Sequence, residues 1–258
     1  MSWNTLLAEL EAELGEPISL DALTGSWRIA QRMAGHRHSV DDVLTAHYAL
    51  CEPVAAPTTR VLDLGSGIGG VGLLALWGLG PAASLYCVEA QAVSHRLLVA
   101  NVAGNRLADR VVTQLGDLRE LALCERFGLI TGSPPYFPLG TGVLPADSQK
   151  AHARFELRGD VGDYAHAAAR HLTPDGVFVF CFPSPQHERA RARVREAGLH
   201  VTASREVVPR VGLRPLFTLF ACRRQPAPER GDPPFEVRGH DGTVTDAMLA
   251  VRRRFGFT

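Results

Sequence analysis

The stretch RVLDLGSGIGGVGLLALWGLG, residues 60–80, decides the fold class. Its first residues are mostly apolar, which is typical of a buried strand. Asp63 lies within this predicted strand. The strand ends at Gly65, and Gly67 and Gly69 continue a tight turn before an apolar helix. Glycines allow a ligand to approach the backbone closely, and the first N–H groups of the helix are free to bind it. The stretch predicts a strand, turn and helix with a ligand-binding turn.

The rest of the chain alternates between strands and helices in the same way. The predicted strands cover residues 60–65, 84–90, 111–117, 127–133, 177–182, 200–208 and 216–223. The last two strands are joined by the short link PRVGLRP, which allows only an antiparallel pair. The pattern predicts an α/β fold with a doubly wound, mostly parallel seven-stranded sheet, an antiparallel last strand, and helices on both faces.

The flanking segments differ from this core. Leucines at helical spacing predict a short helix over residues 4–14, and residues 27–40 are predicted to form a hairpin around Gly35. Residues 225–235 are rich in proline and are predicted to be a linker. A short strand and a helix capped by Thr245 follow it. We therefore divide the chain into an N-terminal helix with a hairpin or lid segment (1–50), a core (51–224) and a C-terminal extension (225–258).

Composition limits the possible classes of protein. The 27 basic and 27 acidic residues cancel, which argues mildly against a large nucleic-acid footprint. The five cysteines and ten histidines form neither a disulfide framework nor a metal-ligand pattern, so we predict a reduced, cytoplasmic protein without a metal. No apolar run is long enough to span a membrane, and the start of the chain lacks the order of a signal peptide.

Acidic residues stand at the ends of the second and third strands. Ligands of such sheets bind outside the carboxyl ends of the strands. Glu89, which is placed to bind the two hydroxyls of a ribose, ends the second strand. Asp117 follows the third strand, where it can accept from an adenine amino group or simply cap a helix. No further fingerprint for a pyrophosphate accompanies them, which favours a nucleoside ligand over a dinucleotide.

The fourth strand ends in an unusual loop, Ser133-Pro134-Pro135-Tyr136. Two prolines lack N–H donors and stiffen the chain, so the loop holds its acceptors in fixed places. A side-chain oxygen and a proline carbonyl can accept the N–H groups of an exocyclic amine, which directs its lone pair toward a methyl donor. The aromatic ring can stack on a base that has left its helix or loop.

These motifs together resemble the class I S-adenosylmethionine-dependent methyltransferases, a Rossmann-like family. The resemblance implies S-adenosyl-L-methionine as cofactor, with Asp63 near its methionine end. It implies further contacts from Gly65, Gly67, Gly69, Glu89 (to the ribose) and Asp117 (to the adenine). It also implies that Ser133, Pro134, Pro135 and Tyr136 form the catalytic loop of an enzyme acting on planar nitrogen.

Within that class, the chain is similar to the bacterial tRNA (adenine-N6)-methyltransferases that modify a valine tRNA. Gly35, His36, Arg37, Ser39 and Asp41 match that family's Gly-His-Arg-x-Ser-x-Asp run before a helix that covers the cofactor. The resemblance implies that His36 and Ser39 contact the cofactor. It also implies that Phe137, Arg154 and Glu156 join Tyr136 in binding the substrate, tRNA.

One departure leaves alternatives open. That family usually has Asn where this chain has Ser133, and a serine hydroxyl can donate as well as accept. Serine also occurs at this place in cytosine-N4 methyltransferases. Cytosine N4, a protein glutamine amide, a small-molecule amine, and a non-catalytic protein that binds cofactor or RNA therefore stay open. So do RNA contacts by the arginines of 189–195 and 252–254, and the choice between monomer and homodimer.

Overall fold

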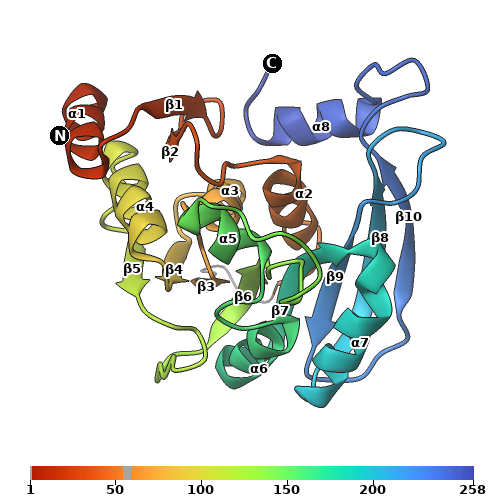
Figure 1. Cartoon of the computed structure of the whole chain (residues 1–258). Helices are drawn as coiled ribbons and strands as arrows, with labels where there is room; N and C mark the ends of the chain where they lie inside the picture. Colours follow the sequence, from red (N-terminus) through yellow and green to blue (C-terminus); the bar gives the residue numbers. More distant parts are fainter. Residues whose placement is uncertain (1, 55–59) are drawn as a thin grey trace.

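The structure, a computed structural model, describes residues 2–54 and 60–258. An eight-stranded sheet in the order β10-β8-β9-β7-β6-β3-β4-β5 forms its centre (Figure 1). The strands are β3 (Arg60–Leu64), β4 (Ser84–Glu89), β5 (Val111–Leu115), β6 (Phe127–Gly132), β7 (Leu172–Pro183), β8 (His200–Val208), β9 (Phe217–Arg223) and β10 (Arg230–Glu236). Strand β9 is antiparallel to both of its neighbours, whereas the other pairs are parallel.

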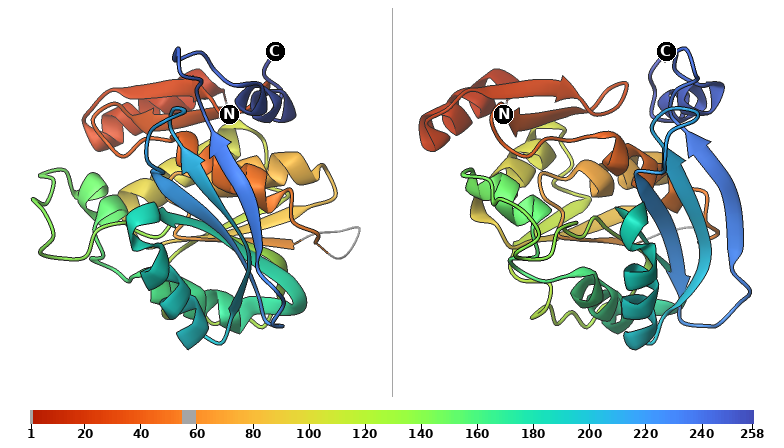
Figure 2. Two further views of the ribbon diagram at one scale, coloured as in Figure 1. Left: turned by 90° about the vertical axis from the view of Figure 1, so that its right-hand side faces the viewer. Right: turned by 45° about the vertical axis from the view of Figure 1, so that its right-hand side comes forward.

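The doubly wound, mostly parallel sheet predicted from the sequence is confirmed, but the predicted count of seven strands is wrong by one. The additional strand is β10, which lies beside β8 at the edge of the sheet (Figure 2) and takes up residues 230–235 of the predicted linker. The short strand expected after the linker therefore begins earlier than predicted and ends at Glu236. Proline cannot donate to a ladder and is tolerated at a sheet edge. The pairing register shifts between Asp232 and Phe235, where Pro233 and Pro234 stand.

Alternating side chains of the central strands fill two separate cores. In β7, Val177 and Val179 belong to one core, and Phe178 and Phe180 belong to the other. Helices α2 (Val40–Ala49), α3 (Gly70–Leu79) and α4 (Ala92–Gly104) cover one face, and α6 (Val161–His171) and α7 (His187–Glu196) cover the other (Figure 1). Burial on both faces explains why the central strands are almost continuously apolar.

The N-terminal hairpin lies earlier in the chain than predicted. It consists of β1 (Ile18–Ala22) and β2 (Arg28–Arg32), which follow α1 (Trp3–Leu14). The hydroxyl of Thr24 accepts the N–H of Trp27 at 2.9 Å and so closes the turn here instead of at Gly35. The segment around Gly35 is a loop, and it faces the cavity described below.

The C-terminal residues lie beside the turn of the N-terminal hairpin. Helix α8 (Asp246–Arg254), whose first turn is capped by Thr245 as predicted, lies near the hairpin (Figure 2). The N–H of Gly25 donates to the carbonyl of Phe255 at 2.8 Å. A Cβ at Gly25 would lie 2.3 Å from the Gly256 carbonyl oxygen, so this close approach requires glycine. The division into 1–50, 51–224 and 225–258 stays a prediction.

Two features are absent from residues 2–54 and 60–258. No helix there is long and apolar enough to cross a membrane. No group of three or more His, Cys, Asp or Glu side chains in these ranges could hold a metal ion. All five cysteines are free thiols.

Candidate active site

A cavity of about 330 Å³ opens at the carboxyl ends of β3, β4 and β6. Its volume lies within the usual range for a small-molecule site. Most of the residues singled out from the sequence line it, namely His36, Ser39, Asp63, Gly65, Gly67, Glu89, Asp117, Ser133, Pro134, Pro135, Tyr136, Phe137 and Arg154. Gly69 and Glu156 are not among the lining residues. The individual roles expected of all these residues stay predictions.

The turn after β3 needs glycine for two different reasons. Gly65 and Gly67 have φ angles of +61° and +55°, in the left-handed region that side chains disfavour. A Cβ on Gly65 would also lie 2.0 Å from the Tyr164 hydroxyl, whereas nothing stands within 4 Å of the corresponding point on Gly67. The Gly67 backbone is therefore open on the side where a ligand could approach. Gly69 has φ +97° and instead packs against Leu73 and Leu98.

Glu89 holds this turn in place from the end of β4. One carboxylate oxygen accepts the N–H of Gly67 at 2.8 Å, and the other accepts the N–H of Gln91 at 2.7 Å. Burial raises the pKa of Glu89, although both N–H bonds oppose the rise. Each oxygen keeps a further lone pair, so the carboxylate can still accept a ligand hydroxyl.

The other two predicted carboxylates differ in environment. Asp63 is buried, where it accepts the hydroxyl of Thr131 at 2.6 Å and the N–H of Gly72 at 3.2 Å. Burial raises the pKa of Asp63 to about 6. Asp117 forms an ion pair with Arg119 at 2.6 Å, and the hydrogen bond from that guanidinium lowers its pKa. No helix begins at Asp117 in the structure, so capping does not account for it.

The Ser-Pro-Pro-Tyr loop enters the cavity from the end of β6. The hydroxyl of Ser133 lies 3.4 Å from the sulfur of Cys181 in β7. The hydroxyl of Tyr136 donates to Asp41 at 3.1 Å and lies 3.2 Å from the same sulfur. Its ring meets Phe182 edge to face, with the ring centroids 6.2 Å apart. The loop is thus anchored through side chains as well as by its prolines.

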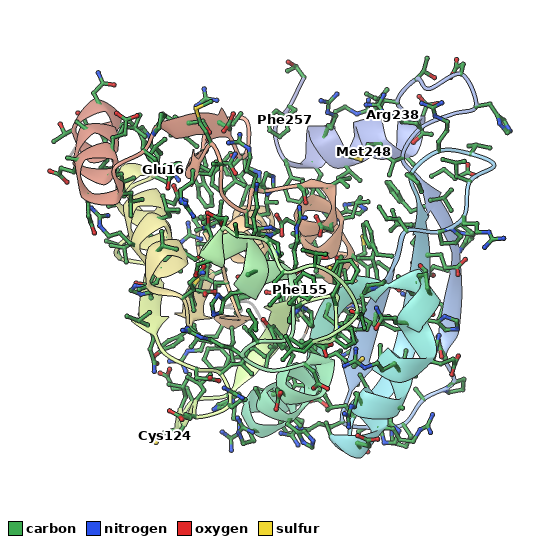
Figure 3. The ribbon with its side chains drawn as sticks, in the orientation of Figure 1. Glu16, Cys124, Phe155, Arg238, Met248 and Phe257 are labelled. Carbon is green, nitrogen blue, oxygen red and sulfur yellow. The ribbon has the colours of Figure 1, made fainter. Side chains whose placement is uncertain are left out.

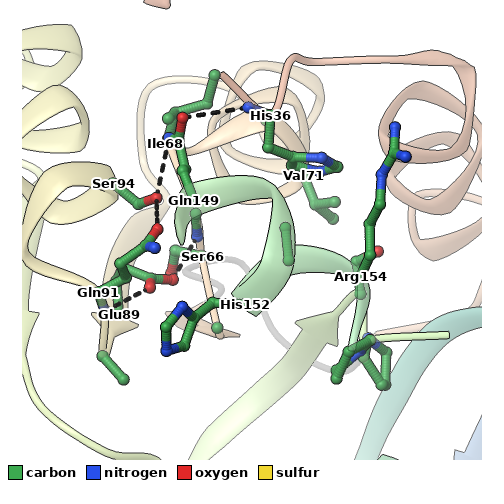
Figure 4. A pocket seen from close by; sticks show the side chains of 18 of the residues that line it. His36, Ser66, Ile68, Val71, Glu89, Gln91, Ser94, Gln149, His152 and Arg154 are labelled. Atoms are coloured by element: carbon green, nitrogen blue, oxygen red, sulfur yellow. Dashed lines mark hydrogen bonds between the residues drawn. The ribbon is translucent and has the colours of Figure 1, made fainter. Parts of the chain in front are cut away.

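A polar network that the sequence did not predict crosses the cavity (Figure 4). Gln149, on the short helix α5 (Ser148–Arg154), donates to the Ser94 hydroxyl at 3.0 Å and accepts the N–H of His36 at 3.1 Å. Ser94 donates in turn to Gln91 at 2.7 Å. The network joins α5, α4 and the loop before α2, which lie far apart in the chain. Asp147, which caps the N–H of Lys150 at 2.9 Å, is the one local signal that could have revealed α5.

The segment that follows the Ser-Pro-Pro-Tyr loop places two residues expected to bind the substrate, Phe137 and Glu156, in different surroundings. Phe137 is 43% exposed, and its ring lies 5.5 Å from that of Phe155, which Figure 3 shows inside the molecule below α5. Glu156 points elsewhere and accepts from Arg189 of α7 at 2.8 Å. Its expected contact with the substrate stays a prediction.

Most of the α7 arginines are occupied within the chain. Besides the pair of Arg189 with Glu156, Arg191 pairs with Glu229, and Arg193 pairs with Glu196 at 2.8 Å. Such pairing leaves these guanidinium groups less available for phosphate. Arg252 and Arg253 of α8 are exposed and form no ion pair with any residue of 2–54 or 60–258.

The chain is similar to curated methyltransferases over most of its length, although no protein-family model matches it. The tRNA1(Val) (adenine(37)-N6)-methyltransferase of Cronobacter sakazakii is 26% identical over 229 residues, 88% of this chain and 91% of that protein. The protein of the same name from Pasteurella multocida is 28% identical over 171 residues, 65% of this chain and 70% of its own length.

Solved structures share the architecture at lower identity. A predicted O-methyltransferase from Agrobacterium tumefaciens superposes with a TM-score of 0.62 at 16% identity, covering 85% of this chain and 98% of that one. The fold is that of a class I methyltransferase. Trm5 of Methanocaldococcus jannaschii, solved in complex with adenosine, superposes on this methyltransferase fold with a TM-score of 0.58 at 13% identity, covering 81% of this chain and 57% of that one.

The curated relatives confirm the predicted resemblance and the enzyme class of S-adenosylmethionine-dependent methyltransferase with its cofactor. The solved structures confirm the predicted fold. The cavity of this methyltransferase fits that cofactor by its chemistry. It is lined by the carboxylates of Asp41, Asp42, Asp63, Glu89 and Asp117, which suit a ligand bearing an ammonium and a sulfonium group. The open backbone at Gly67 allows such a ligand to come close.

Proposed function

We propose that this protein transfers a methyl group from S-adenosylmethionine to N6 of an adenine in tRNA. One observation carries the proposal: the Ser133-Pro134-Pro135-Tyr136 loop and the Glu89 side of the glycine turn line the same cavity. A loop suited to a planar amine thus stands next to a site suited to a nucleoside cofactor. The names of the curated relatives support adenine N6 and tRNA as the target.

Each part of the cavity has a role in this reaction. Glu89 and the turn at Gly65 and Gly67 hold the cofactor, which when bound supplies an electrophilic methyl group. Ser133 Oγ and the Pro134 carbonyl accept the two N–H groups of the adenine amine and direct its lone pair toward the methyl group. Tyr136 supports the ring of the base by stacking. The proton leaves after methyl transfer, so no general base is assigned.

The partner in this proposal is tRNA, and the place of action is the cytoplasm. Five free thiols agree with a reducing compartment. Exposed Arg252 and Arg253, which lack ion-pair partners in the described part of the chain, are candidates for phosphate contacts.

Cytosine N4 is a second candidate target, because Ser133 replaces the asparagine usual in the adenine-N6 family. Cytosine N4 and adenine N6 are both exocyclic amines conjugated to a ring. The same pair of acceptors could therefore serve either base.

A labelling experiment tests the proposal. The protein is incubated with radiolabelled S-adenosylmethionine and, in separate reactions, total tRNA, total protein and a small-molecule extract. We expect label in tRNA and N6-methyladenosine by nucleoside mass spectrometry. An unmodified valine tRNA and a copy with guanine in place of adenine 37, the position named for the relatives, form the matched pair of substrates. Label in protein or extract alone would contradict the tRNA proposal, and N4-methylcytidine would favour the second target.

A further inference from the structure

Beneath the Ser-Pro-Pro-Tyr loop, four side chains from three distant segments of the sequence meet. Cys181, fully buried in β7, lies 3.4 Å from the Ser133 hydroxyl and 3.2 Å from the Tyr136 hydroxyl. Tyr136 donates to Asp41 of α2 at 3.1 Å. Asp41 also accepts the hydroxyl of Ser39. These contacts form an unbroken chain from the Asp41 carboxylate to the hydroxyl of Ser133, which lines the cavity.

The carboxylate sets the direction of every hydrogen bond in this chain. A carboxylate accepts only, so the single proton of Tyr136 points to Asp41. The Tyr136 oxygen is then left as an acceptor, which the S–H of Cys181 can meet. The sulfur is left to accept the O–H of Ser133. Burial and the neighbouring Asp42 raise the pKa of Asp41, whereas the hydrogen bonds from Ser39 and Tyr136 favour its ionised form.

We propose that Cys181 and Asp41 are positioning residues that make the Ser133 hydroxyl a pure acceptor toward the substrate amine. With its own proton held by Cys181, Ser133 Oγ offers only lone pairs to the cavity. It then does what an asparagine carbonyl oxygen would do unaided, since an amide oxygen carries no proton. This inference rests on the proposed function for the amine, and it explains how serine can replace asparagine here.

Two neighbours of the sulfur bear on the assignment. The hydroxyl of Thr45 lies near the Cys181 sulfur and lowers the pKa of that thiol, against the larger rise caused by burial. Thr45 Oγ1 nevertheless has no hydrogen-bond partner among the described residues. Cys222, on β9, provides a matched control. It is as deeply buried as Cys181 but belongs to the core on the opposite face of the sheet.

A double-mutant cycle tests the proposal by activity. Cys181→Ala should lower kcat for tRNA about threefold to tenfold with little change in cofactor affinity. In a Ser133→Asn background the same change should lower kcat less than about twofold, because asparagine needs no proton acceptor behind it. Cys222→Ala should leave kcat unchanged. Equal losses from Cys181→Ala in both backgrounds, or no loss in either, would overturn the proposal.

Infrared spectroscopy of the resting protein gives a readout independent of activity. The S–H stretching band of Cys181, identified by subtracting the spectrum of Cys181→Ala, should lie at lower frequency than that of Cys222. In Tyr136→Phe it should move toward the Cys222 frequency, because the acceptor oxygen is gone. An unchanged band in Tyr136→Phe would refute the assigned direction. A band shift of the same size in Thr45→Val would instead identify Thr45 as the acceptor of the Cys181 S–H and overturn the assignment to Tyr136. A wild-type protein without tRNA methylation would refute the proposed function, and this spectrum would still decide the hydrogen-bond direction.

Discussion

The carboxylate of Glu89 lies 2.8 Å from the backbone nitrogen of Gly67, so the end of β4 and the turn after β3 form one unit. Both groups line the cavity. The residue expected to bind the ribose is therefore also the residue that fixes the glycine turn, and changing it should affect both.

We expect Glu89→Ala to weaken the affinity for S-adenosylmethionine about tenfold to hundredfold, because hydrogen bonds to a charged acceptor are removed. Titration calorimetry with the cofactor measures this. Glu89→Gln keeps one acceptor oxygen and should weaken binding less. Glu120→Ala changes an exposed carboxylate and serves as the control. Unchanged affinity in Glu89→Ala would remove Glu89 from the cofactor site.

Tyr136→Ala should lower kcat/KM for tRNA. The corresponding free energy of activation should rise by about 1–3 kcal/mol, the usual contribution of base stacking. Its cofactor affinity should stay close to that of the wild type. Tyr136→Phe keeps the ring and should reduce kcat/KM less than Tyr136→Ala does in steady-state kinetics. A fall in cofactor affinity in Tyr136→Ala would show that the loop contributes to the cofactor site instead.

The raised pKa of Asp63 predicts a pH dependence of stability. Its pKa rises from 3.8 to about 6 on folding because the carboxyl is buried, so the folded state holds this proton more tightly than the unfolded state. Stability should therefore fall as the pH rises from about 4 to about 6, by about 3 kcal/mol from this group. Asp63→Asn should remove that part of the slope in denaturant titrations at several pH values. The exposed Asp109→Asn should keep it, and an unchanged slope in Asp63→Asn would contradict the assignment.

The ion pair between Glu156 and Arg189 should contribute to stability. Both side chains are largely buried, so Glu156→Ala leaves a guanidinium without its main partner and should cost about 1–3 kcal/mol in the free energy of unfolding. The double variant with Arg189→Ala should cost less than the sum of the single changes. Chemical denaturation measures these values. A rise in KM for tRNA at unchanged stability would instead support the substrate contact inferred from the family resemblance.

Arginines of α8 and α7 should differ in their effect on tRNA binding. Changing Arg252 and Arg253 together to Ala should weaken tRNA binding. It should also reduce the slope of log K against log salt concentration by about one for each phosphate that the two arginines neutralise. Changing Arg191 and Arg193 together, which form internal ion pairs, should leave the salt dependence unchanged. Binding titrations at several salt concentrations make the comparison. Equal slopes in the two double variants would exclude α8 from the interface.

The parts of the fold and of the site that could be predicted from the sequence are those that depend on residues close together in the chain. The glycine turn and the proline loop are each built within one short segment, so their character is visible in the sequence. The edge strand was not predicted because Pro233 and Pro234 argue against a strand unless its position at the sheet edge is known. The predicted position of the hairpin was wrong because the turn at Thr24 depends on a side-chain hydrogen bond to Trp27.

The sequence by itself determined the alternating α/β architecture, the antiparallel strand β9 and the residue types of the cavity. It could do so because the hydrophobic period, glycine and proline act over a few residues. Only the tertiary structure decided which side chains contact one another in and around the cavity. Gln149 with His36, Glu156 with Arg189, and Cys181 with Ser133 are contacts between segments far apart in the chain. Their partners depend on how the strands are ordered and the helices packed, which no local pattern encodes.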